Sequence, residues 1–144
     1  MLDHIDRAAF LKRVGGLFAV ALIDRGPLRL TPMVMSELHH PDPRPGVNAD
    51  HVLSAEDLGS LATKKGVMAA YDAARERPTI FDGLACGCGC TGKGGEHRSL
   101  LACYESKQPT GCPSCRDEAT FVAGLAKQDK SLSEIRLAVD KKFG

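Results

Sequence analysis

Ala85-Cys86-Gly87-Cys88-Gly89-Cys90 is the segment around which the rest of this sequence is organised. Cys103 and the motif Cys112-Pro113-Ser114-Cys115 follow it, so all 6 cysteines of the chain fall between positions 86 and 115. A chain of 144 residues is long enough to bury a core without covalent crosslinks. The cysteines therefore indicate a site rather than a scaffold, because thiolates bind soft and borderline metals.

The two glycines between the first three cysteines decide whether their sulfurs can meet. In a regular strand, Cys86, Cys88 and Cys90 would lie on one side at intervals of about 7 Å, too far apart to surround one ion. Gly87 and Gly89 remove that restriction, since glycine adopts positive φ at little cost. We expect the loop to curl, to turn three sulfurs inward and to point backbone N–H groups at them.

The remaining candidate ligands come from separate elements. Cys112 is predicted to cap a helix that begins at Pro113, where the helix dipole favours the thiolate form. Cys103 lies in an earlier predicted helix, either as a ligand or as a small buried apolar residue. His97, near the start of that helix, is predicted to coordinate, to orient the ligands by a hydrogen bond, or to be an exposed residue without a role. The candidate metal ligands are Cys86, Cys88, Cys90, His97, Cys103, Cys112 and Cys115.

The number of thiols bears on which metal is bound. Six thiolates exceed what one tetrahedral zinc ion needs, so the sequence favours bridging sulfurs or a mixture of ligands and spectators. Copper(I) is the preferred ion, because it accepts low coordination numbers and bridging thiolates, and zinc is the alternative. The predicted use is storage, detoxification or delivery of the metal, which places the protein in metal homeostasis.

Three other uses of the cysteines stay open. They can form disulfides that link the three cysteine groups, or they can hold a structural zinc that supports a docking surface. Cys112 and Cys115 can also serve a thiol–disulfide oxidoreductase, which would be the enzymatic alternative. The chain lacks the βαβ pattern of thioredoxin-like enzymes, so we do not expect an enzyme.

Helical periodicity predicts an all-α fold of about four helices around one core. Ser54 followed by Glu56 and Asp57 marks a helix start, and the apolar spacing continues through residues 63–76 until Pro78. Further helices are expected at 97–106, at 112–127, and from Ser131, which opens a capping box with Glu134. Residues 79–84 are expected to form a short turn that leads to the cysteines.

The chain divides into three predicted regions. Residues 1–27 are expected to be an N-terminal helix or an export-signal-like segment, since basic residues precede about ten apolar ones. Residues 28–53 are rich in proline and indicate a linker, in which Met33, Met35, His39 and His40 either form a second soft-metal port or have no role. Residues 54–144 form the helical, cysteine-rich metal-binding domain. The first region favours an extracytoplasmic location, in the periplasm or at a membrane, over the cytoplasm.

Composition limits the classes of partner. Lys and Arg number 19 against 18 Asp and Glu, and the chain has 5 Phe, 2 Tyr and no Trp. Without a basic block or interleaved aromatic residues, nothing indicates a nucleic-acid partner. The expected partners are metal ions and a protein that receives the metal or assembles with this chain.

The cysteine pattern and its flanking residues resemble the bacterial family named for its PCYCGC motif. The resemblance extends from about residue 66 to 144 and includes Tyr71, the loop 85–90, His97-Arg98-Ser99-Leu100, Cys103 and the Cys112–Cys115 motif. It implies a small bacterial protein, often exported or lipid-anchored, whose cysteines bind metal; no lipobox cysteine lies near this N-terminus. Ala85 replaces the family's proline and Gly87 its tyrosine, so we expect a more flexible and less shielded loop here.

Overall fold

The computed structural model describes residues 38–91 and 94–144, and the regular elements in these ranges are helices. Within these two ranges, six α-helices and two 3₁₀ helices follow in the order α2 (Ala55–Leu58), η1 (Gly59–Thr63), α3 (Val67–Glu76), α4 (Pro78–Asp82), α5 (Leu100–Tyr104), η2 (Gln108–Thr110), α6 (Pro113–Ala126) and α7 (Leu132–Phe143). The described ranges contain no strand, only an isolated bridge between Thr91 and His97. The all-α prediction is therefore confirmed, whereas the predicted N-terminal segment lies outside the described residues.

The helices are shorter and more numerous than the four expected. Pro78 ends α3 as predicted, but it also occupies the first turn of α4, so residues expected to form a turn are helical. Proline is accepted there because the first N–H groups of a helix have no intrahelical partner. Gly59, with φ of 55°, ends α2 after four residues, and η1 replaces the expected continuous helix. The expected bundle of about four helices is therefore not confirmed.

The predicted helix caps explain where the longer helices begin. The side chain of Ser131 accepts a hydrogen bond from the Glu134 N–H, and the carboxylate of Glu134 accepts one from the Ser131 N–H, as the capping box predicted. The sulfur of Cys112 caps α6 by accepting from the Cys115 N–H. Ser99 caps α5, which therefore starts at Leu100 instead of near His97.

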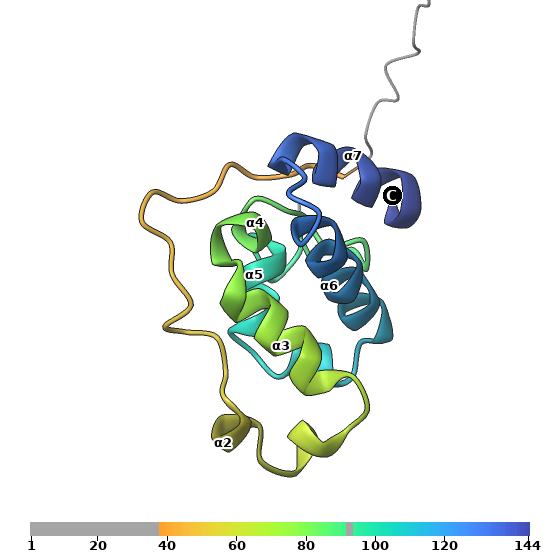
Figure 1. The fold of residues 1–144 in the computed structure, drawn as a ribbon. Coiled ribbons are helices and arrows are strands. Elements are labelled where there is room, and N and C mark those ends of the chain that lie inside the picture. Colours follow the sequence, from red (N-terminus) through yellow and green to blue (C-terminus); the bar gives the residue numbers. More distant parts are fainter. Residues whose placement is uncertain (1–37, 92–93) are drawn as a thin grey trace, which may run out of the picture. The chain divides into compact units, whose positions relative to one another are not determined.

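The core lies between α3, α6 and the short helices α4 and α5. Helix α3 runs beside α6, and α7 also packs against α6 (Figure 1). Three buried rings meet edge to face, with centroids 5.0 Å apart for Tyr71 and Tyr104 and 5.8 Å apart for Phe81 and Tyr104. Such pairs stabilise a core beyond the area they bury. Cys86, Cys103 and Cys115 belong to the same buried cluster, so the cysteine site is continuous with the core.

Residues 38–53, the described part of the proline-rich segment, contain no helix or strand and pack on the helices (Figure 1). Arg44 donates its backbone N–H and its guanidinium to the carboxylate of Asp82, which is completely buried. The hydroxyl of Ser99 also donates a hydrogen bond to the Asp82 carboxylate at 3.0 Å, and the guanidinium of Arg98 forms an ion pair with that carboxylate at 2.9 Å. Burial raises the pKa of Asp82, but the hydrogen bonds from Arg44 and Ser99 outweigh burial and lower it. Asp82 thus fastens the segment to α4 and α5.

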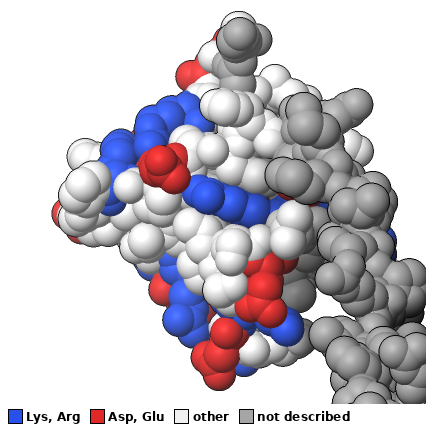
Figure 2. All heavy atoms as spheres, turned by 90° about the horizontal axis from the view of Figure 1, so that it is seen from above, with Lys and Arg blue, Asp and Glu red and all other residues white. Residues whose placement is uncertain are grey.

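The surface carries both signs of charge. On the face in Figure 2, basic and acidic side chains lie interspersed among uncharged ones. None of the helices within 38–91 and 94–144 has the length and apolar character that a membrane span requires.

Candidate metal centre

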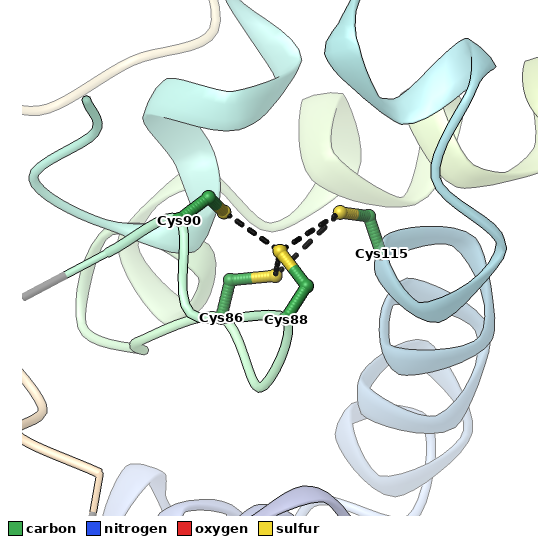
Figure 3. Close-up of side chains that lie close together, drawn as sticks. All are labelled: Cys86, Cys88, Cys90 and Cys115. Carbon is green, nitrogen blue, oxygen red and sulfur yellow. Dashed lines mark hydrogen bonds between the residues drawn. The ribbon is translucent and has the colours of Figure 1, made fainter. Parts of the chain in front are cut away.

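Four sulfurs converge at one point between the cysteine loop and the start of α6. The Sγ atoms of Cys86, Cys88, Cys90 and Cys115 all lie within 4.8 Å of one another, and Figure 3 shows them pointing toward a common centre. Cys115 is 3.6 Å from both Cys86 and Cys88, measured between sulfurs. Thiolates about 2.3 Å from a tetrahedral ion are about 3.8 Å apart. The spacing therefore suits a metal ion held by these four residues.

The other two cysteines flank this group. The sulfur of Cys103 is 3.3 Å from that of Cys90, and the sulfur of Cys112 is 2.6 Å from that of Cys115. Every one of the six sulfurs thus touches another, in a row that runs from Cys103 to Cys112. All six are free thiols in this structure. Four of the predicted ligands form the compact group, and the remaining two cysteines extend it at both ends.

The loop owes its shape to hydrogen bonds from its own backbone. The N–H of Gly89 donates to the carbonyl oxygen of Cys86 at 3.2 Å, which closes a tight turn. Gly89 has the expected positive φ, 79°, whereas Gly87, for which the same was expected, does not. The N–H of Cys86 donates to the Thr91 hydroxyl at 2.8 Å, and the N–H of Gly87 donates to Glu118 at 2.9 Å. These two N–H groups bond to side chains, but the backbone N–H groups of Cys88 and Cys90 point at the sulfurs of Cys86 and Cys88, so the prediction that N–H groups of the loop point at its sulfurs is confirmed for them.

His40 holds the start of the loop. The N–H of Ala85 donates to Nδ1 of His40 at 2.9 Å, and Nε2 of the same ring bonds to Asp140 at 2.9 Å. Nδ1 must therefore be the unprotonated nitrogen and Nε2 the protonated one. Both nitrogens are engaged, so His40 braces the loop against α7 and is not free for the predicted second metal port. Met33 and Met35 lie outside the described residues.

Cys115 is positioned from the core side. Its backbone carbonyl accepts a hydrogen bond of 2.7 Å from the hydroxyl of Tyr104, whose ring is fully buried. Its own N–H donates to the sulfur of Cys112 at 3.3 Å. Both the N–H and the carbonyl group of Cys115 are therefore held by hydrogen bonds. Cys88, in contrast, is exposed and offers the route by which an ion would enter.

The glycine at position 87 leaves room for the C-terminal helix. A Cβ atom built on Gly87 would lie 2.5 Å from Cβ of Phe143 and 2.8 Å from its carbonyl oxygen. Phe143 is itself held by Phe121, with ring centroids 5.7 Å apart, and by Lys142, whose ammonium lies over both rings. Phe143 therefore covers the place where a side chain at position 87 would project, whereas Cys88 and Gly89 in the same loop are exposed.

His97 is directed away from the sulfurs. Its Nε2 bonds to the side-chain oxygen of Gln108, and its backbone N–H donates to the carbonyl of Cys90 at 3.1 Å. The histidine is not part of the group of four converging ligands. It ties the far side of the loop to η2, so its contact with the site is through the Cys90 backbone.

The residue that the sequence did not reveal is Glu118. It is completely buried, its Oε2 accepts the bond from Gly87, and its Oε1 has no hydrogen-bond partner among the described residues. Burial, and then the charge of Cys86, raises the pKa of Glu118 to about 8. Its position gives the only available signal: three residues after Cys115 in a helix, Glu118 must share the face of that cysteine.

The thiols influence one another strongly. Hydrogen bonds from Cys103 and Cys115 lower the pKa of Cys86, which favours the thiolate form of this cysteine over that of its neighbours. The same hydrogen bonding to Cys86, together with burial, raises the pKa of Cys103 and of Cys115. Burial first, then the neighbouring sulfurs, raises the pKa of Cys88. An arriving cation must therefore displace protons from most of these thiols.

No protein-family model matches the chain, and no curated protein or solved structure resembles it significantly. Resemblance to the PCYCGC-motif family stays a prediction from the sequence. The chemistry of the site rests instead on its geometry, which is that of a compact group of four thiols with two more in contact.

Proposed function

We propose that this protein binds soft metal ions, copper(I) above all, in a multi-thiolate site for storage, detoxification or delivery. The observation that carries the proposal is the convergence of four sulfurs within 4.8 Å. Cys103 and Cys112 extend the group at its two ends. If the central sulfurs bridge several metal ions, these two cysteines can serve as terminal ligands. Sulfur-only surroundings select copper(I), zinc or iron–sulfur clusters, and copper(I) accepts the low coordination that six sulfurs around several ions give.

A single zinc ion is the second candidate, because one observation favours it. The distances of 3.6 Å from Cys115 to Cys86 and Cys88 are close to the edge of a tetrahedral four-thiolate zinc site. In that case Cys103 and Cys112 would be spectators. The proteins that would receive the metal or assemble with this chain, and its bacterial and extracytoplasmic origin, stay predictions.

The thiol oxidoreductase has less support. A reactive thiol needs exposure and a lowered pKa. Cys115 is buried and its pKa is raised, by hydrogen bonding to Cys86 and by burial. The thiol with the lowered pKa is Cys86, which is buried as well.

The test is elemental analysis of anaerobically purified protein, with a count of free thiols. We expect several copper ions per chain, and free thiols after the metal is removed. Replacing Cys88 by Ser and, separately, Cys112 by Ser should lower the metal count. Ser114→Ala, an exposed change between Cys112 and Cys115, is the matched control and should leave it unchanged.

Each alternative outcome has a clear meaning. One zinc per chain, unaffected by Cys112→Ser, would establish the zinc alternative. Unchanged metal counts in both cysteine variants, or a protein without metal whose thiols are all oxidised, would refute metal binding by this cluster.

A further inference from the structure

A completely buried carboxyl group lies against the cysteine loop, and one of its oxygen atoms has no hydrogen-bond partner in the part of the chain that the structure describes. Glu118 projects from α6 on the same face as Cys115, and neither side chain is exposed. A buried polar atom without a hydrogen bond costs stability. An apolar residue would fill the same space among Val122 and Ala119 without that cost. The acidic residue is therefore better explained by the site than by the core.

The one bond that Glu118 makes acts on the metal loop directly. Its Oε2 accepts the N–H of Gly87, the residue between Cys86 and Cys88, at 2.9 Å. The two cysteines on either side of this bond have sulfurs only 3.2 Å apart. Regular extended backbone would place them at about twice that distance. Whatever fixes Gly87 therefore fixes the separation of two ligands.

We propose that Glu118 is a positioning residue of the metal site, which holds the Cys86–Gly87–Cys88 turn in the shape that receives the ion. The proposal rests on the metal-binding function proposed above. It differs from that function because Glu118 need not touch the metal. Groups that orient metal ligands by hydrogen bonds typically change metal affinity 10- to 100-fold when they are removed, in round terms.

Three substitutions of Glu118 distinguish the effects of its side-chain length, its charge and its volume. Glu118→Gln keeps an oxygen acceptor at the same length, so the bond to Gly87 is retained. Glu118→Asp keeps the carboxyl but withdraws it by about 1.5 Å, one carbon–carbon bond, so the bond is broken. Glu118→Leu removes the acceptor and keeps the side chain's bulk. Glu134→Gln, at an exposed cap in α7, is the control for loss of a carboxylate elsewhere.

The experiment titrates full-length metal-free protein with copper(I) against a chromogenic chelator, without oxygen, and records the thiolate-to-metal charge-transfer absorption. We expect Glu118→Gln and Glu134→Gln to bind within about threefold of the unchanged protein. Glu118→Asp and Glu118→Leu should lose about 10- to 100-fold in affinity and show an altered absorption band. Thermal unfolding of each metal-free variant is measured alongside.

A purely structural role gives a different pattern. If Glu118→Leu and Glu118→Asp unfold at lower temperature but keep the affinity and the absorption band, the proposal is overturned. Should Glu118→Leu fail to fold, the comparison of Asp with Gln decides alone. An unchanged protein that binds no copper would overturn the proposed function itself, whereas normal binding by all variants overturns only the role of Glu118.

Discussion

Gly87→Ala is the substitution whose cost can best be worked out from the structure. The new Cβ would lie 2.5 Å from Cβ of Phe143, and an ordinary contact begins at 3.4 Å, so the last turn of α7 must retreat by about 0.9 Å. The obstacle includes the backbone carbonyl of Phe143, which no side-chain rotation can move. Forcing a methyl group into a packed site costs about 1–3 kcal/mol.

The assay is thermal and urea unfolding of the metal-free protein, with Gly124→Ala as the matched control. A Cβ on Gly124 meets nothing within 4 Å, and Gly124 lies inside α6. Alanine there should stabilise the protein by about 0.5–1 kcal/mol, as it does within helices. The two alanines should therefore shift stability in opposite directions. Equal stabilisation by both would refute the packing of Phe143 over Gly87.

Three further predictions follow from the buried groups. Asp82→Asn should lower the free energy of unfolding by about 2 kcal/mol or more, since it weakens the buried carboxylate's pairs with the half-exposed Arg44 and Arg98; a loss below about 0.5 kcal/mol in urea unfolding would contradict this. The pKa of Glu118, raised from 4.5 to about 8, means that the folded protein keeps a proton which the unfolded chain releases. The metal-free protein should therefore lose stability relative to Glu118→Gln as pH rises from about 5 to 8, by a few kcal/mol, and a pH-independent difference would be the contrary result. Chelation of the metal should leave the helical circular dichroism largely intact, because the core around Tyr71 and Tyr104 packs without an ion; unfolding on chelation would favour the structural zinc alternative.

Local signals predicted the longer helices well. Ser131 with Glu134, and Cys112 with Pro113, mark the starts of α7 and α6 in the sequence, and both caps are present in the structure. These signals are reliable because a cap is a bond between residues three positions apart. The helix at Pro78 was missed because proline both ends one helix and begins another, and its own chemistry does not distinguish the two.

The sequence predicted that cysteines would converge, but it did not predict the residues that hold them in place. Cysteines are rare enough for their spacing alone to indicate a common site, and four of the six do converge. Glu118 and His40 bond to the loop and Tyr104 bonds to Cys115, and each of these bonds joins residues far apart in the sequence, which local patterns do not show. His97 is not among the converging side chains, because its ring bonds instead to the side chain of Gln108, eleven residues later.

The contact between Gly87 and Phe143 also has a consequence across sequences. A loop residue and a residue near position 144 compete for one volume, so they should not vary independently. In any related chain with tyrosine at the position of Gly87, we expect the last helix to end a turn earlier or to carry a small residue in place of Phe143. Tyrosine in the loop and phenylalanine at the helix end would then be two ways of filling the same volume beside position 87, one from within the motif and one from the last helix.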